Sequence, residues 1–372
     1  MTRAEHPTFA VVTGGGTAGH VNPALAVARA LVARGHDQSA VHYAGAERGI
    51  EARLVPPTGF PMTLLPGRGI QRRLTFANVA AIGGLLLAFV RAVRLLGRLR
   101  PKVVVAVGGY ASVAVALAAV LRRVPLVVAE QNLAPGAANR LLARFAKASA
   151  VSFEGTPLPR AVVTGNPIRP EFAALGDGTG GAGARAALGV GAGRSLVVIT
   201  GGSLGALRIN RAAIEAIDSW RDRHDLAIHH VVGRRDWDEI SAAASDLGAL
   251  EYRAVAYEDD MPGVFAAADV AVCRSGSSTC FELAAMGLPS ILVPSPYVTA
   301  DQQTRNAQLL VDAGGARLVP DAELDGPRLA AEVDRLLADP VARRTMSASI
   351  RSWARPGAAD AIAALAEEHA RA

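Results

Sequence analysis

The stretch Phe9–Arg34, FAVVTGGGTAGHVNPALAVARALVAR, decides the fold. It begins with a short β-branched run, passes through a cluster of glycines at 14–19 and continues into an Ala- and Val-rich segment of helical length. A buried strand that leads through glycines directly into a helix is typical of an open parallel α/β sheet. We expect a strand over Phe9–Thr13 and a helix over Pro23–Arg34.

The same alternation of short apolar runs and helical stretches continues along the 372 residues. It breaks at Pro167–Gly193, where GDGTGGAGA (176–184) predicts an irregular loop, and it restarts at Leu196–Thr200. We therefore expect an α/β protein of two Rossmann-like, doubly wound parallel-sheet domains that face a cleft. The first domain is expected at 1–167 and the second at 168–353, with a last helix in 354–372 that packs back on the first.

Charge is distributed unevenly along the chain. The net charge is +6, yet residues 52–129, between Glu51 and Glu130, contain no acidic residue and eleven basic ones. This stretch therefore carries +11 and the rest of the chain −5. Because the stretch is aliphatic rather than rich in aromatic residues, an anionic membrane surface is a better partner than a nucleic acid.

The apolar run Val79–Val90 and the arginines after it predict a helix that lies in a membrane interface. The alternative is a core helix whose arginines extend to water. The uncharged stretch Val103–Leu121 is long enough to span a bilayer, but it is better described as a strand, a Gly-Gly-Tyr turn and a buried helix. The residues expected on the membrane face are Arg72, Arg73, Ile82, Leu85, Leu86, Phe89, Arg91 and Arg94.

Neither a metal site nor a secretion signal is indicated. Met1–Pro7 lacks the apolar core of a signal peptide, and Cys273 and Cys280 have no disulfide-framework or metal-ligand spacing. Asp236-Trp237-Asp238 adjoins two arginines and predicts a surface helix, and the histidines show no ligand pattern. We expect no metal and no other cofactor.

The first glycine loop, TGGGTAGH (13–20), leads from a strand into a helix, whose N-terminus favours negative charge. Gly14, Gly16 and Gly19 also match the spacing of a dinucleotide site, so an NAD-dependent oxidoreductase remains an alternative. A helix N-terminus favours the neutral form of His20, the form that a general base needs. The alternative is a structural histidine.

Two loops of the second half have related features. GGSLGA (201–206) offers backbone N–H groups and the Ser203 hydroxyl to a diphosphate, unless it is only a tight turn. CRSGSSTCFE (273–282) places Glu282 on a helix, where its carboxylate can accept two ribose hydroxyls or form an ion pair. Gln302 and Gln303 open a further helix, and their amides suit sugar hydroxyls unless the pair is only a solvated helix start.

Eight motifs in order resemble the MurG family over nearly the whole chain. The family consists of inverting GT-B glycosyltransferases that transfer GlcNAc from UDP-GlcNAc to the C4 hydroxyl of MurNAc in lipid I (undecaprenyl-pyrophosphoryl-MurNAc-pentapeptide). The product is lipid II, for peptidoglycan. The motifs are TGGGTAGHVNPALA (13–26), VGGYAS (107–112), EQN (130–132), GNPIR (165–169), GGSLGA (201–206), RSGSSTCFE (274–282), GLPSILVP (287–294) and DQQ (301–303).

The resemblance implies UDP-GlcNAc, lipid I and the anionic inner leaflet as partners, with other cell-wall or division proteins as candidates. It places the enzyme at the cytoplasmic face of the bacterial membrane and implies no metal. It assigns His20 as general base and Thr17, Ala18 and Gly19 to the loop where acceptor diphosphate and donor sugar meet. Asn132 and Arg169 match donor-contacting positions, and Tyr110 matches a substrate-contacting one. The resemblance assigns Ser203 to the UDP phosphates, and Tyr257 and the Glu258 backbone to the uracil. It assigns Ser277, Ser278, Thr279 and Glu282 to the nucleotide, with Glu282 on the ribose, and Gln302 and Gln303 to GlcNAc.

The chain departs from the family pattern at three positions. Ala18 replaces a glycine, Glu258 replaces an apolar residue, and Ala129 stands where some members have a histidine. Another GT-B enzyme that uses a UDP-sugar, an epimerase or a transferase with a soluble acceptor, is the nearest alternative. A membrane-surface nucleotide-binding module is the alternative that is not an enzyme.

Overall fold

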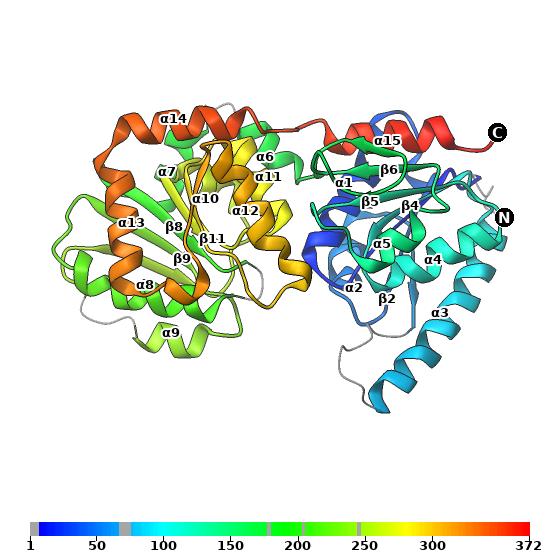
Figure 1. Ribbon diagram of the computed structural model, residues 1–372, viewed down its shortest axis with the longest axis horizontal. Coiled ribbons are helices and arrows are strands. Elements are labelled where there is room, and N and C mark those ends of the chain that lie inside the picture. Colours follow the sequence, from blue (N-terminus) through cyan, green and yellow to red (C-terminus); the bar gives the residue numbers. More distant parts are fainter. Residues whose placement is uncertain (1–6, 67–75, 177–179, 203–204, 244–246) are drawn as a thin grey trace. The chain divides into compact units, whose positions relative to one another are not determined.

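The computed structural model describes residues 7–66, 76–176, 180–202, 205–243 and 247–372, without the side chains of 76–82 and 299. The chain divides into two compact units. Unit 1 consists of Met1–Arg169 and Arg355–Ala372, and unit 2 of Pro170–Ala354. In each unit a parallel sheet is covered by helices (Figure 1).

Unit 1 contains, within its described residues, a seven-stranded sheet in the order β3-β2-β1-β4-β5-β6-β7, with every neighbouring pair parallel. Its strands are β1 (Ala10–Gly14), β2 (Val41–Ala46), β3 (Met62–Leu65), β4 (Val103–Gly108), β5 (Leu126–Glu130), β6 (Ala148–Val151) and β7 (Ala161–Val163). Its helices are α1 (Ala18–Ala33), α2 (Glu51–Leu54), α3 (Phe76–Leu99), α4 (Tyr110–Leu121), α5 (Ala137–Leu142) and α15 (Ala358–His369), with short 3-10 turns at Gln38–Ala40 and Pro56–Thr58.

Alternate residues of the strands face opposite sides of this sheet. Val12 and Val105 belong to the apolar cluster under α1 and α15, whereas Val11 and Val104 belong to the cluster under α3 and α4. Helix α15 packs against α1, where Arg34 forms ion pairs with two carboxylates of α15. A sheet with helices on both faces is the doubly wound arrangement predicted from the sequence.

Unit 2 repeats the plan with a sheet in the order β10-β9-β8-β11-β12-β13, again parallel throughout its described residues. Its strands are β8 (Ser195–Thr200), β9 (Leu226–Val231), β10 (Glu251–Val255), β11 (Val270–Cys273), β12 (Ser290–Leu292) and β13 (Ala316–Leu318). Its helices are α6 (Pro170–Leu175), α7 (Gly181–Leu188), α8 (Leu207–Trp220), α9 (Trp237–Ala243), α10 (Met261–Ala267), α11 (Ser277–Met286), α12 (Gln302–Asp312), α13 (Gly326–Ala338) and α14 (Pro340–Arg351), with 3-10 turns at Thr299–Asp301 and Asp321–Glu323.

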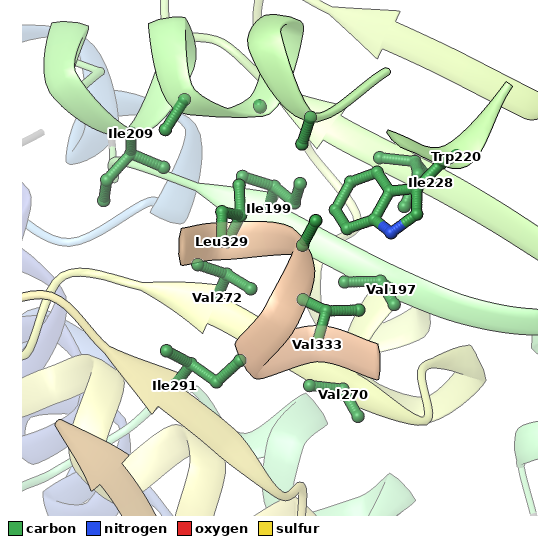
Figure 2. Close-up of a cluster of buried hydrophobic side chains, with 14 of the residues drawn as sticks. Val197, Ile199, Ile209, Trp220, Ile228, Val270, Val272, Ile291, Leu329 and Val333 are labelled. Atoms are coloured by element: carbon green, nitrogen blue, oxygen red, sulfur yellow. The ribbon is translucent and has the colours of Figure 1, made fainter. Parts of the chain in front are cut away.

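The core of unit 2 lies between its sheet and the helices α8 and α13. Figure 2 shows Ile209 and Trp220 of α8 above the strand residues Val197 and Ile199, with Leu329 of α13 in the same cluster. Each of these side chains is at most 1% exposed. This packing fixes β8, and therefore fixes where the glycine loop that follows it begins.

Two sequence predictions were wrong in detail. Helix α1 begins at Ala18 rather than at Pro23. The helix tolerates Pro23 near its N-terminus, because the missing N–H leaves only the carbonyl of residue 19 without its helical partner. The glycine-rich segment 176–184 is not wholly irregular, since α7 begins at Gly181. Arg185 of α7 donates to the Ala267 carbonyl and pairs with Asp269, so tertiary contacts override the weak helix propensity of glycine there.

The stretch Val103–Leu121 forms strand β4 and helix α4, as predicted. No helix in the described part of the chain is long and apolar enough to cross a bilayer.

Candidate active site

The loops of interest in unit 1 follow β2, β1, β4 and β5, which are neighbours in the sheet. The first glycine loop packs backbone against backbone on the loop after β4, where the Gly15 amide donates to the Gly108 carbonyl at 3.2 Å. A Cβ at Gly109, whose φ is +87°, would lie 2.1 Å from the Gly15 carbonyl oxygen. Only glycine at 109 therefore permits this approach.

His20 lies in the first turn of α1 and is half-buried. Its Nδ1 is 3.3 Å from the Thr17 hydroxyl, and the edge of its ring lies against Gly108, where a Cβ would be 3.1 Å from Nε2. Burial lowers the pKa of His20, and the nearby carboxylates of Glu130 and Glu51 oppose that shift. The imidazole is therefore neutral near pH 7 and able to accept a proton.

The two carboxylates near His20 are buried and hold the surrounding loops. Glu51 is fully buried, and its oxygens accept from the amides of Ala46 at 2.8 Å and Gly16 at 3.0 Å. Glu130, 3% exposed, accepts from the Asn132 amide at 2.9 Å and from its side chain at 3.2 Å. It also accepts from the Gly136 amide and from the side chain of Asn139.

Neither carboxylate was predicted from the sequence to have a role in the site. Glu51 and Glu130 are the two acids that bound the acid-free stretch 52–129, but that position alone indicates none of their contacts.

The other predicted residues of unit 1 lie on the same elements. Thr17 precedes α1, and Ala18 and Gly19 are its first two residues. Tyr110 begins α4, and its hydroxyl donates to the Pro66 carbonyl at 2.7 Å. Asn132 follows β5, where Glu130 orients it, and Arg169 is half-buried at the end of the unit's first segment.

In unit 2 the loop after β8 also requires its glycines. A Cβ at Gly201 would lie 2.2 Å from the Ala206 amide nitrogen, and one at Gly205, with φ +77°, would lie 2.4 Å from the Val232 carbonyl oxygen. The Gly202 amide donates to the Thr200 hydroxyl at 3.1 Å. The predicted phosphate ligand Ser203 lies outside the described residues.

Helix α11 begins with Ser277, Ser278 and Thr279, and Glu282 lies in its second turn. The neighbouring α12 begins with Gln302 and Gln303. The Gln303 side-chain oxygen accepts from the Ser295 amide at 2.8 Å, and its carbonyl accepts from the Ser275 hydroxyl at 2.8 Å. These bonds join the loops after β11 and β12, so the predicted ribose and sugar residues lie at one edge of the sheet.

Tyr257 follows β10, and its ring is 37% exposed, with the Arg234 guanidinium 5.1 Å from the ring centroid. The Glu258 carboxylate accepts from the Asp260 amide at 2.9 Å and lies 3.1 Å from Nε2 of His229. Burial lowers the pKa of His229 while Glu258 opposes this. The Glu258 side chain thus fixes the turn.

The predicted membrane face is described only in part. Arg72, Arg73 and the side chain of Ile82 lie outside the described residues. Along α3, Leu86, Leu87 and Val90 are 62%, 46% and 43% exposed, and Arg91 and Arg94 are exposed as well. Leu85 and Phe89, which were predicted to be on the membrane face, instead pack partly on the core of unit 1. Among the described residues of α3, the exposed apolar face consists of Leu86, Leu87 and Val90. Figure 1 shows the N-terminal end of α3 extending beyond the sheet and the other helices of its unit.

Comparison with known proteins identifies the family. Residues 10–151 match the glycosyltransferase family 28 N-terminal domain, and residues 196–364 match the C-terminal domain. A relative from Solibacter usitatus is 41% identical over 97% of this chain and 96% of its own. One from Desulforudis audaxviator is 36% identical over 96% and 97%. Both are named UDP-N-acetylglucosamine–N-acetylmuramyl-(pentapeptide) pyrophosphoryl-undecaprenol N-acetylglucosamine transferase.

Solved structures agree with this result. The crystal structure of Acinetobacter baumannii MurG has a TM-score of 0.76 and 27% identity, covering 97% of this chain and 100% of that one. A putative UDP-N-acetylglucosamine 2-epimerase from Listeria monocytogenes has a TM-score of 0.67 over 98% and 97% of the chains, but at 16% identity it shares the fold alone. The two sheets and their family 28 domains define a two-domain GT-B glycosyltransferase. Within that class the chain belongs to the MurG family. The spacing of Gly14, Gly16 and Gly19 is therefore that of a glycosyltransferase loop and not of an NAD site.

Proposed function

We propose that the protein transfers GlcNAc from UDP-GlcNAc to lipid I, the undecaprenyl-pyrophosphoryl-linked MurNAc-pentapeptide, and so makes lipid II for peptidoglycan. The observation that carries this proposal is the near-complete coverage, at 41% identity, of a relative named for this transfer. The glycine loops around a half-buried, neutral His20 support the base role that the resemblance gives to this residue.

In the proposed mechanism His20 takes the proton from the C4 hydroxyl of MurNAc as that oxygen displaces UDP at the anomeric carbon. Direct displacement inverts the configuration there. The amides of Gly15 and Gly16 already donate to Gly108 and Glu51, so they point into the protein. An acceptor diphosphate would instead meet the first-turn amides of α1, at Ala18 and Gly19.

The donor is assigned to unit 2. The exposed ring of Tyr257 would cover the uracil, and the backbone at Glu258 would read its edge, with that residue's side chain held by His229. The departing UDP charge would be stabilised by amides at the N-termini of α8 and α11. The remaining assignments are Ser203 to the phosphates, Ser277, Ser278, Thr279 and Glu282 to the nucleoside, and Gln302 and Gln303 to GlcNAc; the Gln303 oxygen is already bonded, so its amide nitrogen would donate.

The acceptor is lipid-linked, so we assign α3 to docking on an anionic inner leaflet at the cytoplasmic face of the membrane. Support comes from the exposure of Leu86, Leu87 and Val90 next to Arg91 and Arg94. Apolar side chains bordered by arginines suit the boundary between head groups and acyl chains.

The test is transfer of radiolabelled GlcNAc from UDP-GlcNAc to lipid I in detergent micelles, with a parallel reaction that lacks lipid I. Label in the lipid fraction only when lipid I is present is the expected result. No lipid-linked label, together with conversion of UDP-GlcNAc to its C2 epimer, would overturn the proposal in favour of a UDP-sugar epimerase.

A further inference from the structure

We propose that Glu51 is a positioning residue for the transfer reaction: its buried carboxylate fixes the loop that presents His20. This inference rests on the proposed role of His20 as the base. Glu51 itself does not reach the reacting atoms in this scheme, since it lies beneath the loop and acts through Gly16.

The surroundings of Glu51 are built for a carboxylate. Its side chain is enclosed by three glycines that come from three different segments. A Cβ at Gly15, Gly45 or Gly49 would lie 2.2, 2.6 or 2.0 Å from atoms of the Glu51 side chain. The loop after β1, the end of β2 and the turn before α2 therefore all close around this one group.

The link from Glu51 to His20 runs through two residues. Glu51 holds the Gly16 amide inward, with Gly16 at a φ of +88°. Thr17 then precedes α1 in an extended conformation, and its hydroxyl does not cap the helix but lies 3.3 Å from Nδ1 of His20. On the other side of the loop, the Tyr43 hydroxyl donates to the Gly14 carbonyl at 2.6 Å.

The charge of Glu51 adds a second effect. The charged groups that act on His20 among the described residues are Glu130, at the end of β5, and Glu51, at the start of α2. Both raise the pKa of His20 against the stronger lowering by burial. Removing the Glu51 charge should therefore lower that pKa further. A loosened loop that let water reach the ring would have the opposite effect, since hydration relieves the burial.

Because the two effects on the His20 pKa have opposite signs, the pH profile of Glu51→Gln shows which of them prevails. We expect kcat to fall by about tenfold to a hundredfold, as for a base displaced by roughly 1 Å. The acid limb of the pH profile of kcat/KM should move to lower pH, because the base stays neutral further into the acid range. The Kd for UDP, measured by calorimetry, should stay within about twofold, because the donor is assigned to unit 2.

Two further variants separate reach from charge. Glu51→Asp keeps the charge but shortens the side chain, so kcat should fall without a shift of the acid limb to lower pH. Glu332→Gln, in unit 2, removes a buried carboxylate that is paired with Arg317 and Arg328, and it should leave the pH profile unchanged. Wild-type kcat in Glu51→Gln would overturn the inference.

The proposed function and this inference can fail separately. If the wild-type enzyme transfers no GlcNAc, the proposed function fails. The histidine titration then decides the inference, because the NMR signal of the His20 ring, assigned with His20→Gln, reports the pKa without turnover. A His20 pKa that differs between Glu51→Gln and the wild type supports the role of Glu51, and an equal pKa rejects it. If Glu51→Gln does not fold, a wild-type kcat in Glu51→Asp would also reject it.

Discussion

Gly109→Ala should nearly abolish transfer although residue 109 carries no reactive group. The added Cβ would lie 2.1 Å from the Gly15 carbonyl oxygen. The backbone of residue 109 fixes the position of the Cβ, and the oxygen is itself a backbone atom, so neither can rotate away. To reach ordinary contact the first glycine loop must move by roughly 1 Å, and His20 follows it; a misplacement of that size costs about a hundredfold in rate. In addition, Gly109 has φ +87° and ψ 171°, a region almost restricted to glycine, so alanine there should destabilise the fold by about 1–3 kcal/mol.

Gly155→Ala is the matched control. Gly155 lies in the same unit with φ +76°, and a Cβ there would meet nothing within 4 Å. This variant should lose stability but keep its kcat. The assay is the initial rate of radiolabelled GlcNAc transfer to lipid I at saturating substrates, with Tm measured on the same samples. If Gly109→Ala turned over within about threefold of Gly155→Ala, the packing of the two glycine loops would not position the base, and the reasoning would be refuted.

Three further predictions concern the base, stability and the membrane. His20→Ala should lower kcat by roughly 10²–10⁴-fold while calorimetry finds an unchanged Kd for UDP; near-wild-type turnover would remove His20 from the base role. Burial lowers the pKa of His230 to about 3, below its value in the unfolded chain. The unfolded state therefore binds the proton first, and stability should fall by about 1.4 kcal/mol per pH unit from about pH 6.5 down toward the folded pKa. Chemical denaturation at several pH values should show a flatter dependence in His230→Gln, and an identical slope would contradict this assignment. Arg94→Glu should weaken binding to vesicles that contain phosphatidylserine by roughly 30-fold, at about 1 kcal/mol for each unit of charge; Arg344→Glu on α14 should not, and equal loss in both would indicate net charge rather than a docking face.

The order of the elements could be predicted from the sequence, because each strand of a parallel sheet that is buried on both faces is a short apolar run. The run Leu196–Thr200 predicted β8 to within one residue, and Val103–Leu121 forms the strand and helix that were expected there. The start of α1 could not be predicted, because Pro23 resembles a helix start and only the packing of the glycine loop shows that the helix begins earlier. Helix α7 was not predicted, because its glycines have a low helix propensity. The contact of Arg185 that stabilises it is made with Ala267, 82 residues further along the chain.

The predicted site residues are mostly those with polar groups at strand ends, which sequence patterns report well. The residues that hold them are harder to find, since Glu51 and Glu130 act through backbone amides that no sequence motif displays. Glu258 is a similar case. It replaces an apolar residue of the family pattern, and only the structure shows that His229 lies within hydrogen-bond distance of its carboxylate. Gly16 lies 35 residues from Glu51, and His229 lies 29 residues from Glu258. Both separations are beyond the range of local sequence patterns.

The distribution of charge in unit 1 can now be connected with its chemistry. The acid-free stretch 52–129 ends at two carboxylates, and both are buried with their oxygens occupied by N–H donors. Their charge therefore acts on His20 through space without being presented to solvent. A lipid-linked diphosphate and an anionic leaflet are both repelled by exposed acids and attracted by arginines. Burial of the two acids that bound this stretch lets unit 1 act on His20 with negative charge, while residues 52–129 themselves carry only basic charge.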